Sequence, residues 1–254
     1  MKLFDLSGRV AIVTGGNGGI GLGMARGLAL AGAAVVIAGR NKDKSIEAVK
    51  GLKELGARAS AVVADVTQEA DIQKMFADAE REYGRVDILV NNAGTTVRKQ
   101  PQDLTAAEWH KVMDANLTSA FLCSKAAYPA LKRAGGGKIL NNGSMMSIFG
   151  APYVAAYGAS KGGIVQLTKA LATAWAKDNI QVNAFLPGWV DTELTRGARE
   201  QVPGLNEKVM ARTPAGRWGH YDDFQGIAVF LASRASDFVT GAAIPIDGGY
   251  SSMG

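Results

Sequence analysis

The sequence contains few of the residues that build disulfide or metal-bound scaffolds. Its 254 residues include one cysteine and two histidines. A single cysteine excludes an internal disulfide and a multi-cysteine zinc site, and two histidines argue against a histidine-based metal site. Cys123 lies in an apolar helical pattern, so we expect it to be a buried packing residue rather than a nucleophile. We expect both histidines on the surface and no bound metal.

Long hydrophobic runs and strong charge are also missing. The longest apolar stretch, roughly 27–39, is too short to span a bilayer, and no apolar segment precedes a cleavage site in residues 1–9. We therefore expect a cytoplasmic protein with no membrane partner. The net charge is a modest +5, and no basic run contains interleaved aromatics. These features argue against nucleic acid as a partner and fit a small anionic ligand better.

Short β-rich runs alternate along the chain with longer helical periods. Strands are predicted at 9–14, 34–38, 58–64, 87–90, 138–142, 181–185 and 243–246, and helices at 20–31, 44–55, 69–83, 106–133, 155–177 and 222–232. Such regular alternation favours a parallel sheet with helices on both faces. Because there is no linker and no internal repeat, we predict one α/β domain over residues 1–254, a doubly wound Rossmann sheet.

One stretch, about 189–219, shows no clear periodicity. It contains Pro203, Pro214 and several glycines. A long loop in a compact domain is usually functional, so we predict a lid over a substrate. A poorly ordered surface excursion is the alternative.

The segment 14–21, with the sequence TGGNGGIG, falls between the first predicted strand and the first predicted helix. Glycines at this point permit a tight turn and let the backbone approach a pyrophosphate. The phosphates then lie against the positive end of the helix. The segment therefore predicts a dinucleotide site.

Tyr157 and Lys161 are four residues apart in a predicted helix, so both side chains lie on one face, one turn apart. A cation beside a tyrosine favours the phenolate and lowers the pKa of the phenol from about 10. Such a tyrosine can exchange a proton with a substrate oxygen near neutral pH. Because the pair alone is common by chance, a solvated helix face is the alternative.

Residues 158–162, GASKG, also match the Gly-x-Ser-x-Gly elbow of serine hydrolases. That elbow needs a strand directly before the serine, whereas this segment lies inside a helical pattern. Only His110 and His220 could serve as bases, and His110 precedes the serine, contrary to the hydrolase order. We do not favour a hydrolase.

The glycine spacing and the motifs that follow it together resemble the short-chain dehydrogenase/reductase family over nearly the whole chain. Asn91-Asn92-Ala93-Gly94 follows the fourth predicted strand, and Asn116 lies in the long helix. Ser144 precedes Tyr157 by 13 residues. Pro187-Gly188 with Thr192 follows the sixth strand, and Asp247-Gly248-Gly249 lies near the end. The stretches 88–98 and 214–219 resemble the branch that contains gluconate 5-dehydrogenases and deoxygluconate dehydrogenases.

This resemblance implies a catalytic group of Asn116, Ser144, Tyr157 and Lys161. Tyr157 is expected to be the general acid in reduction and the base in oxidation, and Lys161 to lower its pKa and bind the nicotinamide ribose. Ser144 is expected to bind the substrate oxygen, with Ser147 as a less favoured alternative. Asn116 is expected to hold a water that links Lys161 to solvent.

The resemblance also implies a set of cofactor-binding residues. They are Gly15, Asn17, Gly19, Ile20, Gly21, Arg40, Asp65, Val66, Asn92, Ala93, Gly94, Tyr157, Lys161, Pro187, Gly188, Val190 and Thr192. The second predicted strand ends without an acid for a ribose 2′-hydroxyl, and Arg40 is available for a 2′-phosphate. We predict NADP(H). NAD(H) remains possible because the glycine segment lacks the second basic residue often found in NADP-dependent relatives.

The expected substrate is a small molecule, a sugar acid or related polyol with a secondary hydroxyl. Arg98, Ser144 and Trp189 are candidate substrate residues, and Lys99, Arg196 and Arg199 add positive charge near the expected mouth. A 3-oxoacyl carrier-protein reductase has the same four catalytic residues and is the enzymatic alternative. An NADP-binding sensor or scaffold without catalysis is the alternative of another class. Family members are usually homotetramers, so we expect that state here.

Overall fold

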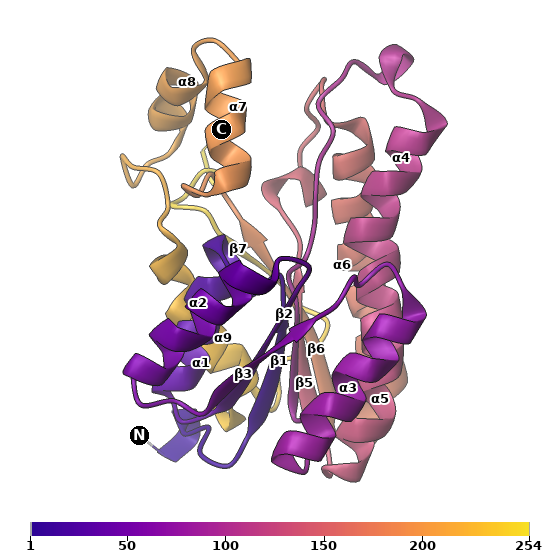
Figure 1. The fold of residues 1–254 in the computed structure, drawn as a ribbon. Helices are drawn as coiled ribbons and strands as arrows, with labels where there is room; N and C mark the ends of the chain where they lie inside the picture. The colour runs from indigo at the N-terminus through magenta and orange to yellow at the C-terminus, as the bar shows by residue number, and fades with distance from the viewer. Residues whose placement is uncertain (1, 254) are drawn as a thin grey trace.

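A computed structural model describes residues 2–253 of the chain. In this part, seven strands form one parallel sheet in the order β3-β2-β1-β4-β5-β6-β7 (Figure 1). The strands are β1 Val10–Thr14, β2 Ala34–Gly39, β3 Ala59–Val63, β4 Ile88–Asn91, β5 Gly137–Asn142, β6 Ile180–Pro187 and β7 Ala243–Ile246. The strand order reverses between β1 and β4. The predicted doubly wound parallel sheet is confirmed.

Helices cover both faces of this sheet, with α1, α2 and α9 on one side in Figure 1 and α3, α5 and α6 on the other. The helices are α1 Gly19–Leu30, α2 Lys42–Glu54, α3 Glu69–Tyr83, α4 Ala106–Met113, α5 Ser119–Arg133, α6 Ala155–Trp175, α7 Glu193–Gln201, α8 Leu205–Arg212 and α9 Gln225–Ala232. Alternate residues of β1 belong to opposite cores: Ala11 and Val13 pack toward α1 and α9, and Val10 and Ile12 pack toward α3 and α5. Burial on both faces explains why the central strands are continuously apolar.

The structure differs from the sequence-based prediction in two places. The predicted helix at 106–133 is interrupted by a π-helical turn, Asp114–Thr118, between α4 and α5. The stretch 189–219 is not a loop, because it contains α7 and α8. Each of these short helices fully buries one side chain, Ala198 in α7 and Val209 in α8. Their sequences therefore carry little of the apolar pattern from which a helix is predicted.

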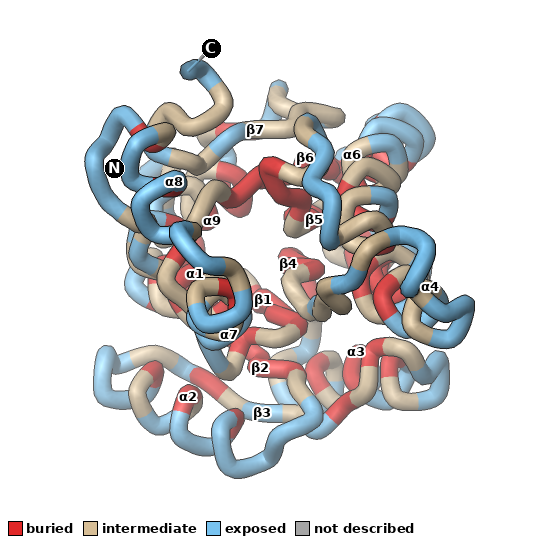
Figure 2. The backbone as a smooth tube through the Cα atoms, turned by 90° about the horizontal axis from the view of Figure 1, so that it is seen from above, coloured by how far each residue is buried: buried red, intermediate tan, exposed pale blue. Residues whose placement is uncertain are grey.

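All strands run in parallel, so the segments that follow them meet at one edge of the sheet. Seen from above, the buried central strands run between two groups of helices whose outer sides are largely exposed (Figure 2). Within the part of the chain that the structure describes, no helix combines the length and apolar character needed to cross a bilayer. No cluster of three or more metal-ligating side chains occurs among those residues either.

Candidate functional site

The glycine turn joins β1 to α1 in a conformation that side chains would obstruct. Gly15 and Gly19 have φ angles of +62° and +50°, in the left-handed region that favours glycine. A Cβ at position 21 would collide with the carbonyl oxygen of Gly15 and the side-chain amide of Asn92. Gly18, at the N-cap, provides no side chain to cap α1. The first amide groups of this helix can therefore meet a phosphate, which fits a dinucleotide.

The end of β4 is tied to this turn by side-chain hydrogen bonds. The amide of Asn92 donates to the carbonyl oxygen of Gly15 at 3.1 Å, and the backbone N–H of Ala93 donates to Oγ1 of Thr14 at 3.1 Å. A Cβ on Gly94 would lie 2.9 Å from Oδ1 of Asn116. Two predicted cofactor residues, Asn92 and Ala93, are thus held against the glycine turn, and Gly94 has no room for a side chain beside Asn116.

A cavity of about 490 Å³ lies beyond the ends of β2 and β3, and five predicted cofactor residues line it. They are Arg40, Asp65, Val66, Ala93 and Gly94. The Arg40 side chain is 79% exposed, and its Nη1 lies 3.9 Å from Oδ2 of Asp65. The backbone N–H of Thr67 lowers the pKa of Asp65. Asn17 lies between the glycine turn and α2, donating to Oγ of Ser45 at 3.0 Å. The cavity's position and lining fit the adenosine half of a dinucleotide.

Tyr157 and Lys161 lie one turn apart on α6, as predicted, but they are not hydrogen-bonded to each other. The Lys161 Nζ lies 5.5 Å from the centroid of the Tyr157 ring and donates to the carbonyl oxygen of Asn142 at 2.6 Å. Lys161 is 3% exposed, and burial lowers its pKa to about 7. The sequence could not identify Asn142 as the hydrogen-bond acceptor of Lys161, because every residue has a backbone carbonyl oxygen.

The expected lowering of the phenol pKa is not found in this structure. Burial raises the pKa of Tyr157, while the hydroxyl of Ser144 and the charge of Arg98 partly oppose that effect. The physical reason is that desolvation of the phenolate outweighs the nearby hydrogen bond and charge. The buried phenol therefore keeps its proton to a higher pH than a solvated tyrosine does.

Ser144 follows β5 and is the hydroxyl that reaches Tyr157. Its Oγ accepts a hydrogen bond from the backbone N–H of Met146 at 3.1 Å. Ser147 is occupied elsewhere: its Oγ accepts from the N–H of Ser144 at 3.2 Å and donates to the carbonyl oxygen of Lys161 at 2.7 Å. This arrangement favours Ser144 over Ser147 as the site hydroxyl and ties its loop to α6.

Asn116 lies in the π-helical turn and connects it to α6. Its side-chain amide donates to the carbonyl oxygen of Thr95 at 3.0 Å and to Oγ of Ser160 at 2.9 Å. The Ser160 hydroxyl in turn donates to the carbonyl oxygen of Tyr157. Ser160 is fully buried inside α6, so the Gly-x-Ser-x-Gly match is not a nucleophile elbow. Both histidines are exposed, as predicted.

The end of β6 forms the other wall of the site. A Cβ on Gly188 would lie 2.7 Å from Cα of Asp247, so Pro187-Gly188 packs directly on the C-terminal turn. Val190 is 2% exposed, and a side chain at Gly19 would meet the Thr192 methyl group. Ile20 packs against the same core as Val190. The chain after β6 therefore lies against the start of α1.

The first turn of α7 contacts elements from two sides of the sheet edge. The Lys44 ammonium of α2 pairs with Glu193 at 2.8 Å. The Arg98 guanidinium, from the segment after β4, donates to the carbonyl oxygen of Leu194 at 3.2 Å. Trp189 forms an edge-to-face contact with Trp218, their ring centroids 5.6 Å apart. The two helices α7 and α8 thus cover this edge, at the top of Figure 1.

The four basic residues predicted near the mouth have different surroundings. Lys99 pairs with Glu108, and Arg196 and Arg199 both pair with Asp191. These three are each paired with an acid, which offsets part of their charge. Arg98 differs because its charge acts on Tyr157, and burial lowers its own pKa.

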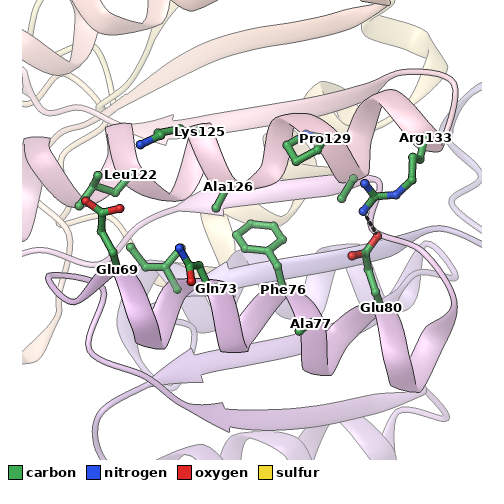
Figure 3. A pocket seen from close by; sticks show the side chains of 12 residues that line it. Glu69, Gln73, Phe76, Ala77, Glu80, Leu122, Lys125, Ala126, Pro129 and Arg133 are labelled. Carbon is green, nitrogen blue, oxygen red and sulfur yellow. Dashed lines mark hydrogen bonds and ion pairs between the residues drawn. The ribbon is translucent and has the colours of Figure 1, made fainter.

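A further cavity of about 330 Å³ lies between α3 and α5, away from these residues (Figure 3). Phe76 and Pro129 line its middle, and the Arg133–Glu80 ion pair, 2.6 Å long, closes one end. None of the predicted site residues lines it. The predicted site residues lie at the carboxyl edge of the sheet instead.

The chain is similar over its whole length to known proteins. A family model described as enoyl-(acyl carrier protein) reductase matches residues 15–251. The 2-dehydro-3-deoxy-D-gluconate 5-dehydrogenase of Formosa agariphila is 41% identical over 250 residues, covering 98% of this chain and 95% of that protein.

Solved structures agree with this similarity. A gluconate 5-dehydrogenase from Burkholderia cenocepacia, in complex with NADP and tartrate, matches with a TM-score of 0.94 and 40% identity, covering 100% of this chain and 99% of that one. A short-chain type dehydrogenase/reductase from Mycobacterium marinum matches with a TM-score of 0.94 and 36% identity, covering 98% of each chain.

Proposed function

Because the chain belongs to the short-chain dehydrogenase/reductase family, we propose that its carboxyl-edge site moves a hydride between NADP(H) and a sugar acid. The resemblance predicted from the motifs is confirmed. The chain is an NAD(P)-dependent oxidoreductase that acts on a CH–OH group. The observation that carries the proposal is that the Lys161 ammonium lies near the Tyr157 ring and that the Ser144 hydroxyl reaches the same phenol.

The four predicted catalytic residues have distinct roles in this proposal. Tyr157 gives its phenol proton to the substrate oxygen in reduction and takes it back in oxidation. Ser144 donates a hydrogen bond to the same oxygen as negative charge develops there. Lys161, when protonated, stabilises the phenolate. Asn116 holds the π-helical turn against the part of α6 that carries Tyr157 and Lys161. The bound nicotinamide supplies or accepts the hydride.

The cofactor we favour is NADP(H), because Arg40 follows β2 where an acid would select NAD. The Arg40 side chain is 79% exposed and lies as far as 3.9 Å from the Asp65 carboxylate, so its guanidinium is accessible to a 2′-phosphate. The Burkholderia cenocepacia relative binds NADP, which supports this preference. Asn17, by contrast, is uncharged and hydrogen-bonded to Ser45, and NAD(H) is therefore the alternative cofactor.

A sugar acid is the substrate class that the relatives favour, since both the Formosa and Burkholderia proteins are named for one. We propose that Arg98 binds the substrate carboxylate and that Trp189 lies against its carbon chain. Helices α7 and α8, within the predicted lid at 189–219, would then close over Arg98 and Trp189. The carrier-protein reductase is not favoured, because these relatives, which match the chain almost end to end, are named for sugar acids.

We further propose a homotetramer in the cytoplasm, made from one domain over residues 1–254. Exposed aromatic side chains support self-association: Phe121 on α5 is 45% exposed, and Phe238, just before β7, is fully exposed. Sedimentation of the purified protein tests this state, and a monomer at micromolar concentration would contradict it.

The first experiment follows absorbance at 340 nm with NADPH or NADH and a panel of keto sugar acids, ketones and acetoacetyl thioesters. Oxidation of NADPH by one keto sugar acid supports the proposal. Activity only with thioesters would move the protein to fatty-acid chemistry. Tight NADPH binding without turnover of any compound would favour the sensor.

A further inference from the structure

Three segments that are far apart in the sequence meet around Arg212, the last residue of α8. The guanidinium carbon of Arg212 lies 4.9 Å from the ring centroid of Phe149 and 4.5 Å from that of Tyr250. The two rings are themselves 6.4 Å apart in an edge-to-face arrangement at 72°. All three distances are in the range of favourable cation–π and aromatic contacts. We call these three residues the Arg212 clasp.

The Phe149 side of the clasp leads to Ser144. The backbone N–H of Phe149 donates to the carbonyl oxygen of Met145 at 2.9 Å, and Met145 follows Ser144 directly. Met145 is 2% exposed and forms a small core with Ala184 and Leu186, against which Phe149 and Tyr250 pack. The position of the Phe149 ring is thus coupled by packing to the turn that carries the Ser144 hydroxyl.

The Tyr250 side of the clasp leads to the C-terminal turn. The Asp247 carboxylate accepts a hydrogen bond from the backbone N–H of Ser251 at 2.7 Å. The N–H of Ala215, three residues after Arg212, donates to the carbonyl oxygen of Gly248 at 3.0 Å. The turn that presents Tyr250 is therefore fixed both internally and to the end of α8.

Arg212 differs from the other arginines of this region in its partners. Arg196, Arg199 and Arg217 each pair with an aspartate. Among residues 2–253, no carboxylate lies within 4.0 Å of the Arg212 guanidinium in the same way. This half-buried cation lies over two aromatic rings instead.

We propose that Arg212 is a positioning residue for the hydride-transfer site, an inference that rests on the proposed oxidoreductase function. It fixes the end of α8 to the Ser144 turn and to the C-terminal turn. Loss of the clasp would leave the fold and the cofactor site in place. The position of the lid relative to the Ser144 hydroxyl would no longer be fixed. The effect is then expected in turnover rather than in cofactor binding.

The test compares Arg212→Met with Arg212→Lys, which keeps a cation that can face the rings. We expect Arg212→Met to lower kcat by about 5- to 10-fold and to change the KM for NADPH by less than about twofold. Arg212→Lys is expected to remain within about twofold of wild type. A lysine variant as slow as the methionine variant would overturn the proposal, because charge over the rings would then be irrelevant.

A second pair of variants tests the partner ring. Tyr250→Leu removes the aromatic face and is expected to match Arg212→Met, whereas Tyr250→Phe keeps the face and is expected to match wild type. The double variant Arg212→Met/Tyr250→Leu is expected within about twofold of either single variant, since both substitutions remove the shared Arg212–Tyr250 contact. Additive losses would contradict the clasp. If Arg212→Met does not fold, the comparison of Tyr250→Leu with Tyr250→Phe tests the proposal.

Proteolysis gives a readout that does not depend on activity. Cleavage by a glutamate-specific protease after Glu200 and Glu207, in α7 and α8, is expected at least ~3-fold faster in Arg212→Met than in wild type. Unchanged cleavage together with unchanged kcat would overturn the proposal. If no substrate is found, so that the proposed function itself fails, faster cleavage still supports the clasp and unchanged cleavage rejects it.

Discussion

The ammonium of Lys161 donates a hydrogen bond to the carbonyl oxygen of Asn142 at 2.6 Å, at the point where β5 ends. A carbonyl dipole is weak compensation for a charge this deeply buried, so burial lowers the pKa of Lys161 to about 7. Without cofactor, the cation that would favour the Tyr157 phenolate is therefore only partly protonated at neutral pH.

A dependence of stability on pH follows from this buried lysine. In the unfolded chain Lys161 keeps its proton up to its ordinary pKa of 10.5, but in the folded protein only up to about 7. Between these values the unfolded state binds more protons, so the free energy of unfolding rises with pH. Wild type is expected to gain about 1–3 kcal/mol over Lys161→Met between pH 7 and 9.5.

Urea unfolding of the cofactor-free proteins, at one fixed protein concentration, measures this difference. The gain is expected to be absent below pH 7, where the lysine is protonated in both states. Parallel stability curves for wild type and Lys161→Met across the whole range would contradict the lowered pKa.

Tyr157→Phe removes the proposed proton donor and leaves the ring in place. We expect turnover to fall at least ~10²-fold, the lower end for loss of a general acid, while NADPH affinity measured by fluorescence changes little. Tyr83→Phe, at the end of α3, likewise removes a tyrosine hydroxyl, but one far from the site, and serves as the control. Near wild-type turnover in Tyr157→Phe would sink the assignment.

Arg40→Gln removes the charge proposed to select NADP(H). We expect the KM for NADPH to rise about 10-fold or more, as for loss of a charge-assisted hydrogen bond, and the KM for NADH to change little. Lys53→Gln removes a charge from the far end of α2 and controls for net charge. Equal effects of Arg40→Gln on both cofactors would assign selection to other residues.

The parts of the site that the sequence predicted are those with a local physical cause. The glycine turn needs small residues at positions 15, 19 and 21 because of φ angles and close backbone contacts. Tyr157 and Lys161 share a helix face by periodicity alone. In a parallel sheet, the motifs that follow successive strands necessarily meet at one edge, so their order along the chain predicted the site's place.

Other features depend on contacts that leave no pattern in the sequence. The Asn142 acceptor is a backbone atom, and the raised pKa of Tyr157 results from burial by segments that are distant in sequence. The acids that neutralise Lys99, Arg196 and Arg199 could be identified only in three dimensions. The Arg212 clasp likewise joins residues 38 or more positions apart, with no motif in any of them.

Arg98 provides the most discriminating test of the substrate class. Burial lowers the pKa of its guanidinium, and its side-chain partner among residues 2–253 is the carbonyl oxygen of Leu194. A partly desolvated arginine with a neutral partner gains most from a carboxylate. Arg98→Gln is therefore expected to raise the KM for a keto sugar acid about 10-fold or more, the loss expected for a hydrogen bond between charged groups.

The same substitution is expected to change the KM for the uncharged amide of that acid by less than about twofold, because no ionic contact is lost. Lys99→Gln is the matched control, since Lys99 is the neighbouring cation and pairs with Glu108. Steady-state kinetics of both variants on acid and amide separate the possibilities. If Arg98→Gln raises both KM values equally, its role is to hold α7 through Leu194, and the carboxylate is bound by another group.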